Sequence, residues 1–247
     1  MYNITAVSYS NTLPFIYGIE NSGILKDFSL SLEVPAKCAE RFITNQTDIA
    51  LMPVGAINSI DEFNIITDYC IGASGKVKSV LLLSQKPLAE INTIFLDLES
   101  RTSVNLVKVL AKFWWKKIYD WQYLTDSNYA SLQAVESMVV IGDKAMDLAS
   151  DYKYVYDLSE EWNAFTGLPF VFACWVSKKG IDISFINDLN RAIAYGVENK
   201  HKAVDIALSK RNYSFDLYEY LDKNIDFFLD KQKQKALNLF LDYKRKI

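Results

Sequence analysis

The fold of this chain is decided by an unbroken apolar run, Phe170-Val171-Phe172-Ala173-Cys174-Trp175-Val176. A strand that lacks alternation between apolar and polar residues is typical of a sheet whose two faces are both covered by helices. A second run, Val77–Leu83, is also mostly apolar and comes earlier in the chain. We therefore predict two long strands, each buried on both sides.

Around these two runs, short apolar segments alternate with segments typical of helices. Pro14 and Pro35 each suit the first turn of a helix. Apolar residues in Ser103–Trp115 recur at the spacing of one helix face. Such alternation favours mostly parallel strands with helices on the faces of the sheet. The further strands that we predict are Asn3–Val7, Leu30–Val34, Asp48–Met52, Thr93–Leu96 and Met138–Ile141.

The remainder of the chain is predicted to be helical, at Ile183–Glu198, Lys202–Lys210 and Ile225–Lys246. The two long strands bracket a middle segment with its own strand-helix-strand pattern, so we expect the chain to cross into a second lobe and return. We predict an α/β fold with mixed sheets, in which residues 1–84 and 172–247 form one lobe. Residues 85–171 form the other lobe, inserted through two crossover strands. A cleft between lobes is the preferred place for a small ligand.

Composition limits the partners and the location of the protein. Half of the residues are hydrophobic, and 27 basic residues nearly balance 30 acidic ones, so we predict no nucleic-acid partner. Met1–Val7 lacks the basic and apolar regions of a signal peptide. No apolar run reaches the ~20 residues of a membrane span. We expect a cytoplasmic protein without a membrane span, and the sequence predicts no particular oligomeric state.

The cysteines and the single histidine exclude several chemistries. Cys38, Cys70 and Cys174 are widely spaced and include no CxxC pair, so a disulfide framework or a zinc site is not expected. His201 lies in a charged stretch, where we expect a solvated helix position. A two-histidine metal site cannot be built, and a Ser-His-Asp triad would require His201. Because the chain lacks GxGxxG, GxxxxGK and GxSxG motifs, we predict no cofactor.

Polar residues and glycines lie next to several predicted strands, in Ser8–Thr12, Ser74–Lys76, Ser100–Ser103 and Gly142–Lys144. In open α/β sheets, ligands bind beyond the carboxyl ends of strands, and helix N-termini at that edge favour anions. The pattern indicates a small anionic ligand in a cleft, with Arg101 as a bidentate clamp. Taken singly, the same residues are explained as helix caps, an ordinary turn and an ion pair between Arg101 and Glu99.

Six segments resemble one family, in order and over most of residues 3–176: Val7–Pro14, Ser74–Leu82, Asp97–Val104, Ile141–Ala145, Tyr156–Trp162 and Thr166–Ala173. It is the menaquinone-biosynthesis family whose members dehydrate chorismate to 3-[(1-carboxyvinyl)oxy]benzoate in the futalosine route. The resemblance implies a two-lobed, periplasmic-binding-protein-like (type II) fold, a hydro-lyase activity and a dicarboxylate substrate, chorismate. One departure is Leu13, where many members carry a basic residue, so the carboxylate contacts of that loop do not carry over.

The resemblance implies Asn11 as the catalytic residue. We hypothesise that a carboxylate of the substrate accepts the ring proton while Asn11 and hydroxyl donors hold the geometry and stabilise developing charge. A competing hypothesis makes Asp143 or Glu99 the general base. No metal ligand is predicted. The residues predicted to bind substrate are Ser10, Ser74, Ser79, Arg101, Thr102, Ser103, Gly142 and Asp143.

Two alternatives of other classes stay open. A non-catalytic binding protein for a small carboxylate would share the fold, but a receptor normally carries a signal peptide or a lipid anchor, and a sensor carries an effector domain. The related dihydroxynaphthoate synthase also shares the fold, but it begins with a different motif and uses a histidine. The Ser8–Thr12 segment and the isolated position of His201 argue against that enzyme.

Overall fold

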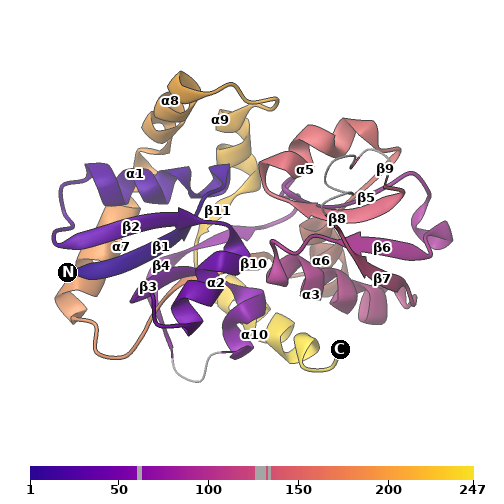
Figure 1. Ribbon diagram of the computed structural model, residues 1–247, viewed down its shortest axis with the longest axis horizontal. Coiled ribbons are helices and arrows are strands. Elements are labelled where there is room, and N and C mark those ends of the chain that lie inside the picture. The colour runs from indigo at the N-terminus through magenta and orange to yellow at the C-terminus, as the bar shows by residue number, and fades with distance from the viewer. Residues whose placement is uncertain (60–62, 126–131, 133–134) are drawn as a thin grey trace.

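Two mixed β-sheets, each covered by helices, form the two halves of the molecule in a computed structural model that describes residues 1–59, 63–125, 132 and 135–247 (Figure 1). The six-stranded sheet has the order β11-β4-β10-β3-β1-β2, and the five-stranded sheet has the order β7-β6-β8-β5-β9. The strands of the larger sheet are β1 (Tyr2–Val7), β2 (Phe28–Glu33), β3 (Ile49–Pro53), β4 (Asn64–Ala73), β10 (Phe170–Ser177) and β11 (Asp226–Phe228). Those of the smaller sheet are β5 (Val80–Ser84), β6 (Thr93–Leu96), β7 (Asp120–Tyr123), β8 (Ser137–Ile141) and β9 (Tyr154–Asp157).

Helices cover both sheets, as the strand-helix alternation predicts. Beside the larger sheet lie α1 (Leu13–Asn21), α2 (Pro35–Ile43), α7 (Ile183–Glu198), α8 (Lys200–Lys210), α9 (Leu217–Glu219) and α10 (Lys231–Lys244). Beside the smaller sheet lie α3 (Arg101–Val109), α5 (Asp143–Leu148) and α6 (Leu158–Thr166). Helix α10 contacts both β10 and α3, so the end of the chain touches both halves. Among the described residues, no helix is both long enough and apolar enough to cross a membrane.

The apolar run at 170–176 forms β10, and every residue of that strand is buried, as predicted. It pairs antiparallel with β3 on one side and with β4 on the other, whereas β1 runs parallel to both β2 and β3. Strand β5 is also buried throughout, but it begins at Val80 rather than at Val77. Lys78 has a φ of +61°, a left-handed conformation that no strand residue adopts, so the strand cannot start before it.

Two corrections concern the larger sheet. Its longest strand, β4, is not among the predicted strands, because its first half carries Asn64, Thr67 and Asp68 and lacks a clear apolar pattern. The predicted helix Ile225–Lys246 is wrong at its start, where Asp226–Phe228 forms β11 and pairs with β4. The helix begins only at Lys231, where the Asp230 side chain caps it by accepting a hydrogen bond from the Lys233 N–H.

The chain passes between the sheets twice. Residues 74–79 lead from β4 to β5, and α6 leads from β9 back to β10. Because β5 belongs to the smaller sheet, the first connection comes ahead of the predicted lobe boundary at residue 84.

Cys38, Cys70 and Cys174 are buried free thiols, and this burial raises the pKa of each thiol.

Helices α1 and α7 cross at a glycine pair that fixes the position of α1. A Cβ atom on Gly196 would lie 1.9 Å from the Pro14 carbonyl oxygen, and one on Gly18 would lie 2.0 Å from the Ala192 carbonyl oxygen. Only glycine allows two helix backbones to approach this closely. The crossing therefore also sets the place of the turn Ser10–Thr12, which leads directly into α1.

Replacing Gly196 by alanine is expected to lower the free energy of unfolding by about 2 kcal/mol or more, because the added Cβ forces α1 and α7 apart. This cost outweighs the ~1 kcal/mol that helix propensity alone would return. Urea unfolding followed by circular dichroism measures the change. Glu198→Ala, at an exposed site of the same helix, is the control, with an expected change within about 0.5 kcal/mol. Equal stability of Gly196→Ala and wild type would contradict the close crossing.

Candidate functional site

A cavity lies between the two sheets and takes its walls from both. Water-sized molecules have about 50 Å³ of room in it, enough for a few waters, so a larger ligand requires the walls to move. No lysine, arginine, histidine, aspartate or glutamate is among the described residues that line it. The lining residues are Val7, Tyr9, Asn11, Thr12, Pro35, Pro53, Ile71, Val77, Ser79, Val80, Ser100, Thr102, Ser103, Ile141, Gly142, Phe172 and Ala173.

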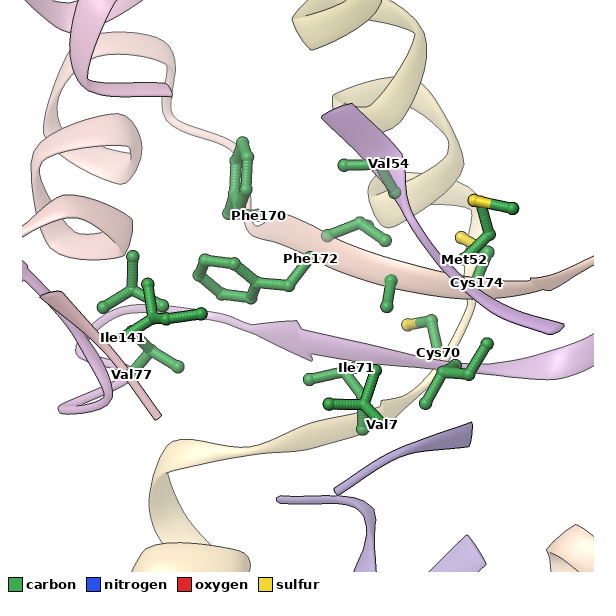
Figure 2. Packing of buried hydrophobic residues seen from close by; sticks show 14 of the residues in the cluster. Val7, Met52, Val54, Cys70, Ile71, Val77, Ile141, Phe170, Phe172 and Cys174 are labelled. Atoms are coloured by element: carbon green, nitrogen blue, oxygen red, sulfur yellow. The ribbon is translucent and has the colours of Figure 1, made fainter. Parts of the chain in front are cut away.

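One wall of the cavity is apolar. Figure 2 shows the Phe172 ring reaching from β10 toward Val77 and Ile141 on the side of the smaller sheet. Phe172 also packs edge-on against Phe170, with 4.8 Å between the ring centroids, which fixes its orientation.

The turn after β1 brings Asn11 to the cavity. The Thr12 hydroxyl lies 2.6 Å from the Val7 carbonyl oxygen and 2.7 Å from that of Tyr9, which holds the turn Ser10–Thr12 against the strand end. The Asn11 side chain then lines the cavity. Its Oδ1 atom is buried and has no hydrogen-bond partner among the described residues. A buried acceptor without a donor is costly, so this oxygen is the group that a ligand or an ordered water would satisfy.

Ser79 faces Asn11 from the connection between the sheets. The Lys78 N–H donates to Asp157 Oδ2 at 2.7 Å, which holds the left-handed residue in place and points Ser79 inward. Asp157 also caps α6, and its burial raises its pKa despite these backbone hydrogen bonds. The Tyr220 hydroxyl donates to Ser79 Oγ at 2.7 Å. Burial raises the pKa of Tyr220 above its usual range.

The N-terminus of α3 forms the opposite side of the cavity. Ser100 caps the helix, since its Oγ accepts from the Ser103 N–H at 3.1 Å and lies 2.9 Å from Ser103 Oγ. Thr102 Oγ1 accepts from the Gly55 N–H at 3.0 Å and lies 3.3 Å from the Phe172 carbonyl oxygen, so it joins α3 to the larger sheet. A helix N-terminus carries a partial positive charge, which favours an anionic group nearby.

Gly142 lines the cavity through its backbone. Its φ of +70° and ψ of −158° fall in a region open only to glycine, and a Cβ atom there would lie 2.9 Å from the Tyr9 ring. Its N–H donates to the Ser79 carbonyl oxygen at 2.9 Å, which ties β8 to the connection before β5. Gly142 therefore lets Tyr9 close over the cavity.

Ser10 and Asp143 meet outside the cavity and join the two halves. The Ser10 hydroxyl donates to Asp143 Oδ2 at 2.7 Å and its N–H donates to Asp143 Oδ1 at 3.2 Å. Arg211 forms an ion pair with the same carboxylate. A second contact is centred on Glu99. The Tyr9 hydroxyl donates to the Glu99 carboxylate at 2.8 Å, and the Lys144 ammonium group lies 3.3 Å from the same carboxylate. Burial and then the Glu99 carboxylate raise the pKa of Tyr9 far above its usual range.

The structure separates the predicted site residues into two groups. Asn11, Ser79, Thr102, Ser103 and Gly142 line the cavity, whereas Ser10, Ser74, Arg101 and Asp143 do not. The exposed Ser74 donates to Asp226. Arg101 is exposed on α3 near Lys244, whose pKa is lowered by burial and then by the charge of Arg101. Arg101 therefore does not line the cavity, where the predicted clamp would hold an anion.

The isolated histidine lies away from the cavity. His201 is exposed on α8 and contacts Asp222, which also pairs with Lys200 at 2.8 Å. This placement on a solvated helix confirms the sequence interpretation. In the described part of the chain, no group of three or more histidine, cysteine, aspartate or glutamate side chains could hold a metal ion.

Sequence reasoning missed five residues that shape the site. Tyr9 and Thr12 lie in the quoted Ser8–Thr12 segment, so their position beside Asn11 was the available signal. Ser100 and Phe172 were likewise within recognised segments. Tyr220 gave no signal, because it lies in a C-terminal part of the chain without a recognisable motif and reaches the site only through the fold.

Comparisons with known proteins identify a family and two sequence relatives. A family described as menaquinone biosynthesis matches residues 2–246. A chorismate dehydratase of Campylobacter jejuni is 26% identical over 247 residues, covering 95% of this chain and 94% of that protein. One from Thermus thermophilus is 25% identical over 190 residues, covering 69% of this chain and 68% of that protein.

Solved structures show the fold. A protein of Archaeoglobus fulgidus has a TM-score of 0.79 at 12% identity, covering 99% of this chain and 97% of its own. A Candida albicans protein, described as having the generic periplasmic binding protein fold, has a TM-score of 0.68 at 14% identity, covering 100% and 94%. An alkanesulfonate-binding protein of Xanthomonas axonopodis, bound to MOPS, has a TM-score of 0.65 at 10% identity, covering 98% and 93%. The predicted periplasmic-binding-protein-like fold is confirmed.

Replacing Gly142 by alanine is expected to lower the free energy of unfolding by about 3 kcal/mol, through backbone strain and the clash with Tyr9. Gly167→Ala is the matched control. Gly167 has the same φ of +70° with a ψ of 9°, and a Cβ there meets no described heavy atom within 4 Å. It should cost only about 1 kcal/mol. Chemical denaturation compares the two variants, and equal losses would contradict the packing of Tyr9 on Gly142.

Proposed function

This chain belongs to the menaquinone biosynthesis family, and from that premise we propose that it is a chorismate dehydratase. The reaction converts chorismate to 3-[(1-carboxyvinyl)oxy]benzoate and water, which places the protein among the lyases. Relatives named chorismate dehydratase support this choice within the family.

The observation that carries the proposal is the composition of the cavity wall. Hydroxyl and amide groups of Asn11, Ser79 and Ser103 face an apolar wall at Phe172, and the N-terminus of α3 adds positive potential. Such a site suits a ring that carries carboxylates and a hydroxyl group. Neutral donors hold the carboxylates by hydrogen bonds, and the apolar wall packs against the ring.

The absence of lysine, arginine, histidine, aspartate and glutamate among the described lining residues bears on the mechanism. Dehydration breaks one ring C–O bond and one ring C–H bond, and the proton and the hydroxide leave as water while the ring becomes aromatic. Glu99 and Asp143 are held in contacts outside the cavity, which supports a different acceptor for the ring proton. A carboxylate of the substrate is then the base. Asn11 and Ser79 orient the substrate and stabilise the departing hydroxide, each worth about 3 kcal/mol of barrier.

A second candidate is a binding protein for a small carboxylate, without catalysis. The fold similarity to an alkanesulfonate-binding protein favours it. Purified protein mixed with chorismate, without added metal or cofactor, separates the two. Chromatography with mass detection should show 3-[(1-carboxyvinyl)oxy]benzoate. Binding of chorismate without product would support the binding protein instead.

Asn11→Ala is expected to lower kcat for chorismate by at least about 100-fold, because it removes the buried amide that faces the substrate. The measurement is product formation under saturating chorismate. Asn105→Ala is the control, since Asn105 lies on α3 and donates to the Arg101 carbonyl oxygen away from the cavity. Unchanged kcat in Asn11→Ala would remove Asn11 from the catalytic role.

Asp143→Asn and Glu99→Gln separate the two hypotheses about the base. If a substrate carboxylate takes the proton, each variant should keep kcat within about 10-fold of wild type, because neither side chain lines the cavity. Steady-state kinetics with a parallel measurement of chorismate affinity provides the test. Turnover that vanishes in either variant while chorismate still binds would assign the base to that carboxylate.

A further inference from the structure

Aromatic rings gather at the β7 edge of the smaller sheet, away from the cavity. They come from the π-helical segment Leu110–Trp115 that follows α3, from β7 and the residue before it, from α6, and from the end of α10, which contacts α3 (Figure 1). None of these rings lines the cavity. We call the set the aromatic band, and its members are Phe113, Trp114, Trp115, Tyr119, Trp121, Phe165 and Tyr243.

One part of the band joins the end of the α3 segment to α6 and α10. The ring centroids of Phe113 and Tyr243 lie 4.8 Å apart. The Phe165 ring lies 5.4 Å from Tyr243 and 5.6 Å from Trp114, again between centroids. Three elements of the chain therefore hold these rings in fixed positions.

The other part of the band extends from Trp114 to the edge strand β7. The indole N–H groups of Trp114 and Trp115 both donate to the Glu161 carboxylate, at 2.9 and 2.8 Å. The Tyr119 ring lies 6.3 Å from Trp115 and 5.5 Å from Trp121 between centroids. The band is thus one continuous cluster, built from residues that are far apart in sequence.

Lysines place positive charge on the band. Four ammonium groups lie between 5.2 and 5.8 Å from centroids of its rings, a range in which cation–π attraction acts. Positive charge is thereby held against the aromatic surface. The pairs are Lys108 with Trp121, Lys112 with Phe113, Lys117 with Tyr119 and Lys246 with Tyr243.

The sequence around the band is basic, although the whole chain is acidic. Residues 108–123 contain only one acidic residue, Asp120, whereas the chain has a net charge of −3. Glu161 adds a negative charge, but the two indole groups occupy it. Uncompensated positive charge favours an anionic partner. In the described part of the chain, no ion pair is formed by the lysines of this segment, which are Lys108, Lys112, Lys116 and Lys117.

The band also exposes apolar side chains. Ile118 is 94% exposed and Trp114 is 39% exposed. Ile118 comes shortly after the left-handed Lys116, where a φ of +53° ends the helical segment and turns the chain. Exposed tryptophan and isoleucine side chains between lysines are typical of segments that lie in a membrane interface.

The packing of the rings argues against a nucleic acid as the anionic partner. A nucleobase stacks on an open aromatic face. The Trp115 and Tyr119 rings meet at 87°, so the edge of one covers the face of the other, and Lys117 lies over Tyr119. Ammonium groups and exposed apolar side chains are the groups that suit lipid headgroups and the acyl chains just below them.

We propose that the aromatic band and its lysines form a docking surface for an anionic lipid bilayer. The lysines attract the phosphate headgroups, and Ile118 and Trp114 enter the interface between headgroups and acyl chains. Such peripheral contact requires no membrane-spanning helix. Because no ring of the band lines the cavity, docking leaves the cavity outside the contact. The inference does not rest on the proposed function.

Sedimentation with lipid vesicles tests the docking surface. Wild-type protein should bind vesicles of equal parts phosphatidylglycerol and phosphatidylcholine at least about 10-fold more tightly than vesicles of phosphatidylcholine alone. Raising the salt concentration from about 0.1 M to about 1 M should weaken this binding, because the Debye length falls from ~10 Å to ~3 Å.

Fluorescence quenching separates insertion from adsorption. Lipids brominated in their acyl chains quench tryptophans that enter the bilayer. With anionic vesicles they should quench the wild-type emission, and Trp114→Phe should lose much of this quenching. Trp162 and Trp175 are fully buried and supply a constant background. Bound protein without quenching would overturn the proposal, because the exposed apolar side chains would then stay in water.

Variants at exposed positions locate the contact. Lys112→Glu combined with Lys116→Glu should weaken binding to anionic vesicles about 20-fold or more, since each basic residue contributes roughly a factor of five. Ile118→Ser should weaken it about 5-fold or more. Controls on the larger half should change binding less than about 3-fold. These controls, also at exposed positions, are Lys202→Glu combined with Lys210→Glu, and Ile183→Ser.

Loss of vesicle binding by wild type at low salt would overturn the proposal, and so would equal losses in the band variants and the control variants. Binding of a single-stranded oligonucleotide without binding of vesicles would assign the lysines to nucleic acid and would overturn it as well. None of these measurements uses chorismate, so a failure of this inference and a failure of the proposed function are distinguishable.

Discussion

The insertion of β10 between β3 and β4 is the constraint on which the rest of the structure depends. This strand returns the chain from the smaller sheet and lies antiparallel to both neighbours, so it fixes where the two halves meet. Its Phe172 contributes a side chain to the cavity wall and a carbonyl oxygen close to the Thr102 hydroxyl. One strand therefore positions the apolar wall and the N-terminus of α3 relative to each other.

The other crossing, at residues 74–79, is fixed by individual hydrogen bonds rather than by strand pairing. Residues 74–79 turn through a left-handed Lys78, and three neighbours hold that turn. Asp157 accepts its N–H, Gly142 donates to the Ser79 carbonyl oxygen, and Tyr220 donates to the Ser79 hydroxyl. These partners come from the cap of α6, the end of β8 and the C-terminal segment. Ser79 is thus defined by regions that are distant in sequence, which makes its position sensitive to the whole fold.

Much of the architecture was predictable from local patterns, and the limits have physical reasons. Uniformly apolar strands such as β10 stand out, and family-like segments located Asn11, Ser79 and the residues at the start of α3. Strand β11 was read as helix because three residues carry no periodicity of their own and are held in the sheet by pairing with β4. Arg101 was expected at the cavity, but the first residue of a helix can point its side chain outward while Thr102 and Ser103 point inward. Helix capping fixes the backbone and leaves this choice of face to tertiary packing.

The distribution of charge explains how such a polar site can be buried at low cost. A lone lysine or arginine in the cavity would lose its hydration and cost several kcal/mol before an anion arrived. Hydroxyls, an amide and a helix N-terminus carry partial charges only, so lining a small cavity with them costs less desolvation free energy. The full charges lie outside it, where Asp143 pairs with Arg211, and Glu99 with Lys144. The Asp143–Arg211 ion pair joins the two halves, whereas the Glu99–Lys144 pair lies within the smaller half and Glu99 contacts the larger half through the Tyr9 hydroxyl. Neutral groups therefore line the cavity, and the ion pair that joins the two halves lies outside it.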